Sequence, residues 1–155
     1  MNIRIATTDA ELAACYPVMR ELRPHIGEEH FLSQVRRQER ASYRLAYVQD
    51  QDRVVAVAGF RVGESLSWGK FLYVDDLVTH SGYRSKGYGA TLLSWLKEHA
   101  TLQGCKQIHL DSGAQRKDAH RFYEREGMSL IGFHFFENLG PHEALQRDAP
   151  QAARP

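Results

Sequence analysis

A helix-like stretch between two strand-like stretches is the feature that most restricts the fold of this chain. Residues 89–104, GATLLSWLKEHATLQG, place apolar side chains at helical spacing, while residues 70–79, KFLYVDDLVT, and 106–112, KQIHLDS, are typical of strands. A helix that connects two neighbouring strands makes those strands parallel. Residues 43–62 hold two further strand-like runs around the polar QDQD, which predicts an antiparallel hairpin. The sequence therefore predicts an α/β fold, a central mixed sheet with helices on both faces.

The remaining segments add elements around this centre. Residues 2–6 predict a short strand, and residues 7–22 predict a helix for which Thr7 or Thr8 is the N-cap. Three more elements are expected: a helix over residues 27–40, a short helix over residues 116–127, and one or two last strands over residues 128–139.

Length and charge limit the classes of protein to which the chain can belong. With 155 residues, of which 43% are hydrophobic, residues 1–139 are expected to form a single domain. Residues 140–155 are rich in proline and poor in apolar side chains, so we expect a flexible C-terminal tail. The net charge of +1 provides no overall field for nucleic acid or for an anionic membrane, and neither is expected as a partner.

Cysteine and histidine spacing predicts no metal site. Cys15 and Cys105 lie far apart in the sequence, and the eight histidines form no pair at a zinc-binding helical spacing. No signal peptide is recognisable at the start, and no apolar run is long enough to span a bilayer. A cytoplasmic location is therefore expected.

The glycine-rich stretch GYRSKGYG, residues 82–89, lies just before the central helix. Glycines at a helix start allow a phosphate to approach the unpaired backbone N–H groups. A nucleoside triphosphatase loop is excluded because Tyr88 stands where a lysine is required, and the dinucleotide pattern fails because its third glycine would fall at Leu92. The pattern that does match is [RQ]-x-x-G-x-[GA], with Arg84, Gly87 and Gly89.

With this loop, the acidic strand YVDDLVT before it and the segment DAHRFYEREGM after the next strand, the chain resembles the GNAT superfamily of N-acetyltransferases over residues 2–137. The resemblance implies acetyl-coenzyme A (acetyl-CoA) as co-substrate, with its pyrophosphate on the loop and its pantetheine arm along the strand. The positions implied for this site are Leu77, Val78, Thr79, Arg84, Ser85, Lys86, Gly87, Tyr88, Gly89, Ala90 and Arg116. At Arg116 many members of the family have an asparagine that contacts the cofactor arm, and an arginine could instead reach a phosphate.

Direct attack of a primary amine on the thioester needs a base and an acid. Asp75 matches the acidic residue that serves as general base in some members, and water or Asp76 are the alternatives. Because alternate strand residues face opposite sides, Asp76 is expected on the other face unless a bulge intervenes. Tyr123 matches the general-acid tyrosine, and its phenol is protonated at neutral pH. Simple packing of Tyr123, and ion pairs of the two aspartates, are the competing interpretations.

The acceptor is left open by the sequence. Glu28, Glu29 and Glu39 could favour a cationic amine or could simply be solvated, and both small-molecule and peptide amines are possible acceptors. Two other functions compete: a non-catalytic acyl-CoA sensing module on the same fold, and a nucleic-acid factor using Arg36, Arg37, Arg40 and Lys86, which the balanced charge opposes. A homodimer through a late edge strand is also possible.

Overall fold

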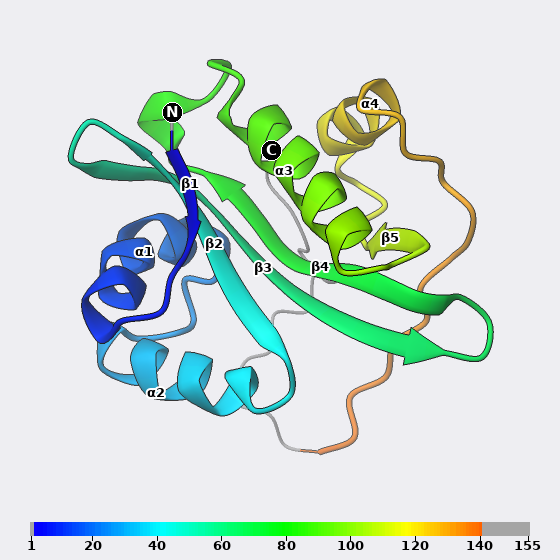
Figure 1. The fold of residues 1–155 in the computed structure, drawn as a ribbon, viewed down its shortest axis with the longest axis horizontal. Coiled ribbons are helices and arrows are strands. Elements are labelled where there is room, and N and C mark those ends of the chain that lie inside the picture. The colour runs from blue at the N-terminus through cyan, green and yellow to red at the C-terminus, as the bar shows by residue number, and fades with distance from the viewer. Residues whose placement is uncertain (1, 141–155) are drawn as a thin grey trace.

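A computed structural model describes residues 2–140 and contains one twisted sheet of five strands in the order β1-β2-β3-β4-β5 (Figure 1). Neighbouring strands are antiparallel except for the last pair, β4 and β5, which is parallel. The strands are β1 Asn2–Ile5, β2 Tyr43–Asp50, β3 Arg53–Ser65, β4 Gly69–Thr79 and β5 Gln107–Leu110. The predicted hairpin and the predicted parallel crossover are both confirmed.

Helices cover both faces of this sheet, as the sequence predicts (Figure 1). Helices α1 and α2 pack on one face, where Leu12, Phe31 and Val78 share a buried cluster. Helices α3 and α4 pack on the other face, where Leu92 and Phe122 belong to a second cluster. The helices are α1 Asp9–Leu22, α2 Glu28–Glu39, α3 Tyr88–Leu102 and α4 Lys117–Arg125, and a 3₁₀ turn covers Ser81–Tyr83.

The start of α1 is closed by a reciprocal cap. The Thr8 hydroxyl accepts a hydrogen bond from the Glu11 N–H at 3.2 Å, while the Glu11 carboxylate accepts from the Thr7 and Thr8 N–H groups at 2.9 and 3.0 Å. These bonds satisfy donors that a helix start otherwise leaves unpaired. Thr8, one of the two predicted residues, is therefore the N-cap.

The strands β4 and β5 pair over only part of the length of β4. Their ladder runs from Phe71, opposite Gln107, to Val74, opposite Leu110, whereas β4 continues to Thr79. Beyond Val74, β4 is therefore paired with β3 alone, and its other edge has no neighbouring strand among the described residues. Backbone groups on such an edge need partners other than a strand.

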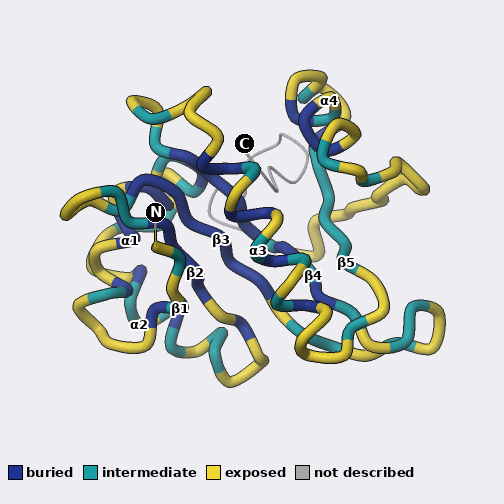
Figure 2. Tube along the Cα trace, turned by 45° about the horizontal axis from the view of Figure 1, so that its top comes forward, coloured by how far each residue is buried: buried dark blue, intermediate teal, exposed yellow. Residues whose placement is uncertain are grey.

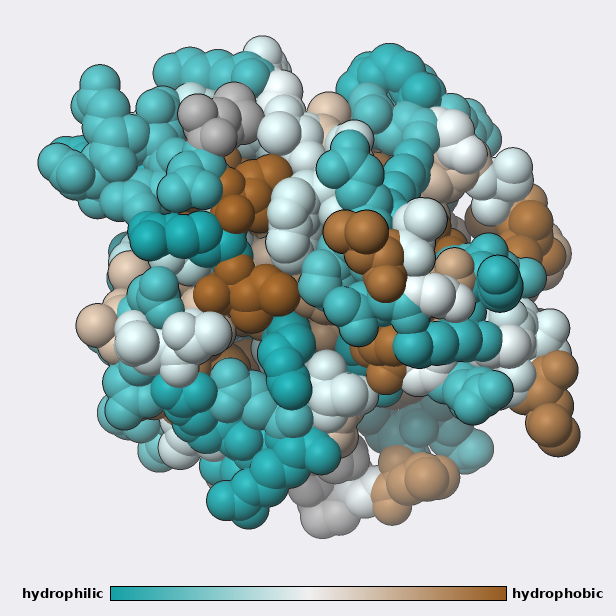
Figure 3. All heavy atoms as spheres, viewed as in Figure 1, coloured by the Kyte–Doolittle hydropathy of each residue, from teal (hydrophilic) through white to brown (hydrophobic). Residues whose placement is uncertain are grey.

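The strands predicted over residues 128–139 are not found, and this prediction is wrong for the described structure. Residues 128–139 belong to no ladder, and Phe133 and Phe135, expected to pack in a sheet, are 89% and 93% exposed. The segment is yellow in Figure 2, and apolar groups gather at the right-hand rim of Figure 3, where Figure 1 shows this orange segment. Strand-like composition does not produce a strand where no neighbouring edge is paired with it. The predicted tail at residues 141–155 lies outside the described residues.

Candidate active site

The loop before α3 leaves the start of this helix open. Gly87 is the N-cap with a left-handed φ of +83°, Ser85 has a φ of +63°, and no side chain of the described residues caps the helix. The first turn of α3 also lacks an acidic residue, in contrast to the first turns of α1, α2 and α4. A Cβ added at Gly87 would meet no atom within 4 Å, so the space beside it is open. Uncapped N–H groups and the helix dipole make this end of α3 suited to an anion.

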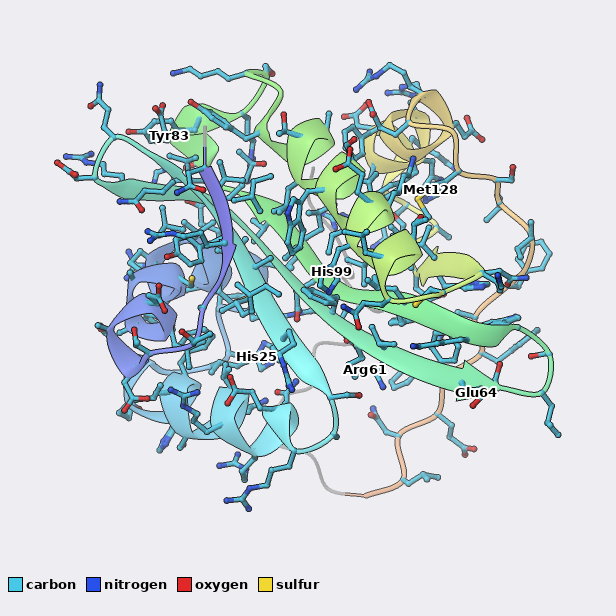
Figure 4. All side chains as sticks on the ribbon, viewed as in Figure 1. His25, Arg61, Glu64, Tyr83, His99 and Met128 are labelled. Atoms are coloured by element: carbon cyan, nitrogen blue, oxygen red, sulfur yellow. The ribbon has the colours of Figure 1, made fainter. Side chains whose placement is uncertain are left out.

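The side chains of the loop are arranged differently from its backbone. Arg84 points back toward the end of β4, with Nη2 3.4 Å from Glu21 and Nε 3.4 Å from the Thr79 carbonyl oxygen. The Lys86 ammonium lies 5.0 Å from the centre of the Tyr83 ring, and Figure 4 shows Tyr83 at the far end of β4 from Glu64. Lys86 is thus the loop cation that has no carboxylate partner among the described residues.

The Tyr88 side chain turns inward, away from the loop surface. It is 8% exposed and belongs to the cluster beneath α3, and its hydroxyl donates to Asp50 at 2.5 Å. The backbone of Tyr88, Gly89 and Ala90 forms the uncapped helix start. The sequence predicts Tyr88 as a cofactor-binding position but gives no sign of its contact with Asp50.

The two adjacent aspartates of β4 lie on the same side of the sheet. The register passes from Gly59 opposite Asp76 to Phe60 opposite Val74, so Asp75 is an extra residue in the ladder. This bulge breaks the alternation of faces, and both carboxylates line one cavity. The expectation that Asp76 points to the other face is therefore wrong, and the bulge is the physical reason.

Each aspartate has its own set of partners. The Asp75 carboxylate accepts two hydrogen bonds of 2.8 Å from Arg61, whose side chain is 47% exposed. The Asp76 carboxylate accepts from Arg23 Nε and from the Tyr43 hydroxyl, both at 2.8 Å, and it is almost fully buried. Arg23 also donates to the main-chain carbonyl of Asp75 at 3.0 Å, which fixes the bulge.

Burial affects the protonation of two groups in this network, Asp75 and Tyr43. It raises the pKa of Asp75 above the usual aspartate value, while the hydrogen bonds from Arg61 oppose the rise. Burial, with the neighbouring Asp76 carboxylate second, raises the pKa of Tyr43 well above its usual value. Tyr43 therefore stays protonated and donates its hydrogen bond. The Asp75 carboxyl takes up a proton at a higher pH than an ordinary aspartate does.

The cavity beside these carboxylates has a volume of about 300 Å³ and lies between β4 and helices α1 and α2. Figure 4 places His25, one of its lining residues, beside β2 on the α1 and α2 side of the sheet. The lining residues are Met19, Arg23, His25, Ile26, Phe31, Gln34, Val35, Gln38, Tyr43, Asp75 and Asp76. The lining thus combines polar and charged side chains with apolar ones.

The glutamates that could have favoured a cationic acceptor lie elsewhere. Glu28, Glu29 and Glu39 are not among the residues that line the cavity. Glu39 accepts hydrogen bonds from Arg36 Nη1 at 2.9 and 3.2 Å, and Glu29 lies 3.5 Å from His30. These contacts give no support for a purely cationic acceptor.

On the other face of the sheet, the Tyr123 hydroxyl is buried without a hydrogen-bond partner among residues 2–140. Tyr123 packs in the cluster between β4, α3 and α4. Burial raises the pKa of its phenol well above the usual value, and the charge of nearby Arg116 opposes this rise. The phenol thus stays protonated and has a proton to donate.

A second buried hydroxyl in the same part of the molecule was not identified from the sequence. Ser112 follows the end of β5, and its Oγ atom likewise has no partner among the described residues. A serine after a strand carries no spacing or composition signal that would have marked it. Within residues 2–140, no three His, Cys, Asp or Glu side chains lie close enough to hold a metal ion, and no helix is long and apolar enough to cross a membrane.

Comparisons with known proteins show the family to which the chain belongs. Residues 7–128 match the acetyltransferase (GNAT) family. The uncharacterized N-acetyltransferase YhdJ of Bacillus subtilis (strain 168) is 34% identical over 137 residues, which are 87% of this chain and 96% of the relative. Two shorter matches cover about two fifths of each chain: the aminoalkylphosphonate N-acetyltransferase of Salmonella typhimurium, 36% identical over 66 residues, and the glucosamine 6-phosphate N-acetyltransferase of Arabidopsis thaliana, 34% identical over 61 residues.

Solved structures show the same fold. A putative acetyltransferase from Agrobacterium tumefaciens superposes with a TM-score of 0.78 at 20% identity, covering 89% of this chain and 99% of the other. The aminoglycoside N-acetyltransferase AAC(6')-Iy in complex with CoA gives a TM-score of 0.77 at 12% identity, covering 88% and 93%.

The family match and the similarity to YhdJ define an acetyl-CoA-dependent N-acetyltransferase. The chain belongs to the GNAT family of acetyltransferases. Enzymes of this class transfer the acetyl group of acetyl-CoA to a primary amine that attacks the thioester directly.

Proposed function

We propose that acetyl-CoA binds across the loop before α3 and along the free edge of β4. The uncapped start of α3 carries this proposal, because its N–H groups and the left-handed Gly87 suit the pyrophosphate. Lys86, which has no carboxylate partner among the described residues, adds a positive charge beside them. Leu77, Val78 and Thr79 lie beyond the last β4–β5 pair and offer backbone groups to the pantetheine amides. When bound, acetyl-CoA supplies the acetyl thioester for the amine.

Asp75 is proposed as the group that receives the proton of the amine, directly or through water. Asp76 is less suited because Arg23 and the buried Tyr43 already hold its two oxygens. Among the described residues, the Asp75 carboxylate accepts side-chain hydrogen bonds from the half-exposed Arg61, whose guanidinium can turn into solvent when a substrate ammonium takes its place. A base with a raised pKa is also the stronger proton acceptor.

Tyr123 is proposed as the proton donor to the departing thiolate. As the amine nitrogen bonds to the acetyl carbon and the carbon–sulfur bond breaks, the phenol gives its proton to sulfur. An N–H group on the free edge of β4 donates to the carbonyl oxygen during the attack. Arg116, which lies close enough to affect the Tyr123 pKa, is proposed to pair with a cofactor phosphate.

For the acceptor, we propose a small primary amine that also carries an acidic group. A purely cationic amine that pairs with Asp75 would leave Arg61 without its carboxylate. A zwitterionic amine exchanges both partners, since its ammonium pairs with Asp75 and its anion pairs with Arg61. The two shorter-matching relatives named above act, by their names, on an aminoalkylphosphonate and on an amino sugar phosphate, and both acceptors combine an amine with an anionic group.

We also propose a cytoplasmic location. Cys15 is buried and Cys105 is partly buried, and both are free thiols. Free thiols in a compact domain fit a reducing compartment, where acetyl-CoA is also used.

Calorimetric titration with acetyl-CoA tests the cofactor site. Gly87→Ala should weaken binding at least about tenfold, because a side chain at a left-handed position disturbs the backbone that faces the phosphates. Gly104→Ala is the matched control, since Gly104 has a φ of +76° and equally open surroundings after α3. Equal affinity of the two variants would remove the loop from the cofactor site.

The acceptor proposal is tested by the release of free thiol in a panel of amines. We expect 2-aminoethylphosphonate to be acetylated with a higher kcat/KM than propylamine or spermidine. Arg61→Gln should raise KM for the phosphonate about tenfold and should lower KM for propylamine, which then no longer competes with Arg61 for Asp75. Arg53→Gln, a strand-end residue of β3, is the control. A preference for spermidine in the wild-type enzyme would contradict the proposal.

A further inference from the structure

Residues 128–139, which follow α4 and are called here the apolar segment, have no role in the proposed reaction. Most of the large hydrophobic side chains that the described structure leaves exposed belong to this segment. They are Leu130, Ile131, Phe133, Phe135, Phe136 and Leu139. The segment is exposed along its length in Figure 2. Because large exposed apolar patches on soluble proteins mark interaction sites, a surface that covers this segment is expected.

The apolar side chains occur at both odd and even positions of the segment. In a strand, Ile131, Phe133 and Phe135 would point to one face, while Leu130 and Phe136 would point to the other. A strand that is apolar on both faces is typical of one that is covered on both faces. The described chain covers neither face, since Phe133 is 89% exposed and Leu130 is 77% exposed. The segment thus has the composition of an inner strand without the neighbours of one.

An unpaired sheet edge lies beside this segment. The sheet ends at β5, whose outer edge has no neighbouring strand among the described residues. The segment passes the end of β5, where His134 Nδ1 lies 3.2 Å from Asp111 Oδ2. Both side chains are partly exposed, so this contact contributes little to holding the segment in place. An open edge of this kind can pair with a strand of another chain.

We propose that two copies of this chain associate about a two-fold axis beside β5. The apolar segment of each copy pairs as a strand with the outer edge of β5 in the other copy. A two-fold contact needs both complementary parts on one patch of the chain, and β5 and the apolar segment lie at the same end of the sheet. The other free edge, that of β1, lies at the opposite end (Figure 1). This inference does not depend on where acetyl-CoA or the amine binds.

The apolar area of the segment is sufficient for such a dimer. Phe133 and Phe135 would each bury about 150 Å². Leu130, Ile131 and Leu139 would each add roughly 100 Å², the area that corresponds to burying an aliphatic side chain. Two copies would therefore bury on the order of 1,200 Å², which reaches the size of specific and stable interfaces. Pairing of the segment with β5 would add hydrogen bonds to this area.

Light scattering after size-exclusion chromatography, at several protein concentrations, measures the number of chains in the full-length protein. We expect two chains for the wild type and one for a variant that combines Phe133→Glu with Phe135→Glu. The dissociation constant of the dimer should rise at least about 100-fold, because each substitution counts twice in a two-fold interface. The variant should keep the circular dichroism of the wild type, since both side chains are almost fully exposed within one chain. Leu66→Glu, in the turn between β3 and β4, is the matched control and should stay dimeric.

Hydrogen exchange locates the interface. Amides of residues 107–110 and of the apolar segment should exchange more slowly at high than at low protein concentration, and those of Asn2–Ile5 should not change. The melting temperature of the wild type should rise with protein concentration, and that of the double variant should not.

Four results would overturn the inference. A wild type that stays a single chain at every concentration would show that no second copy covers the segment. Assemblies that grow beyond two chains would contradict a closed two-fold contact. A double variant that remains dimeric, or slowed exchange at β1 and not at β5, would place the interface elsewhere. Loss of folding in the double variant would show that the two phenylalanines pack within their own chain.

Discussion

Asp75 and Asp76 follow one another on β4, yet their carboxylates line the same cavity. The bulge places Asp75 beside the half-exposed Arg61, while Asp76 lies with Arg23 and the buried Tyr43. Two adjacent carboxylates therefore have different environments and different consequences when they are replaced. Loss of Asp75 should affect the reaction, and loss of Asp76 should affect the fold.

Asp75→Asn should lower kcat about 10²- to 10⁴-fold, the range for a lost general base, with little change in melting temperature. In the wild type, activity should rise with pH as Asp75 loses its proton. Since burial raises this pKa, the rise should be centred above the aspartate reference of about 3.9. The pH profile of kcat/KM measures this, and the variant should lack that rise. Asp118→Asn, on the exposed side of α4, should keep the wild-type profile.

Gly59→Ala should destabilise the protein by about 3 kcal/mol, as expected when a buried hydrogen bond to a carboxylate is broken. A Cβ at this position would lie 1.9 Å from the Tyr43 hydroxyl oxygen and 2.5 Å from Asp76 Oδ2. The two side chains would have to separate, which leaves both polar groups buried without each other. Urea unfolding measures the change, and Gly132→Ala, where a Cβ meets no atom within 4 Å, should be close to neutral. Similar unfolding midpoints for the two variants would contradict this account.

Tyr123→Phe should lower kcat about 10²- to 10⁴-fold and leave acetyl-CoA affinity nearly unchanged. Its melting temperature should not fall, because the hydroxyl has no partner among the described residues. Tyr43→Phe is the contrasting variant. It removes the hydrogen bond that Tyr43 donates to the buried Asp76 and should therefore lower stability. Full activity of Tyr123→Phe would assign Tyr123 to packing alone.

Local signals in the sequence predicted much of this molecule. Thr8 and Glu11 have the spacing of a helix start, and Gly87 precedes an amphipathic helix, so each could be placed without tertiary information. The order of strand, helix and strand was sufficient to predict the parallel pair of a mixed sheet. These features depend on residues that are close in the chain.

The features that the sequence did not predict depend on partners that are distant in the chain. The bulge at Asp75 depends on how β4 pairs with β3, and the direction of Arg84 depends on Glu21, which is separated from it by 63 positions. The burial of the Ser112 hydroxyl without a hydrogen-bond partner among the described residues likewise depends on its surroundings in the fold. Periodicity in a sequence carries no information on register or on the absence of a hydrogen-bond partner.

Glu11 gives a test of stability against pH. Hydrogen bonds from the Thr7 and Thr8 N–H groups lower the pKa of its carboxyl from 4.5 to about 2. The folded pKa is below the unfolded one, so the carboxylate stabilises the fold above about pH 4.5, and this contribution is lost as the pH falls toward 2. Glu11→Gln should therefore melt below the wild type at pH 7, and the difference should shrink steadily between pH 5 and pH 3. Glu124→Gln, an exposed residue of α4, should follow the wild type throughout. A melting difference between Glu11→Gln and the wild type that stays constant over this range would show that the cap acts through packing and not through the ionised carboxylate.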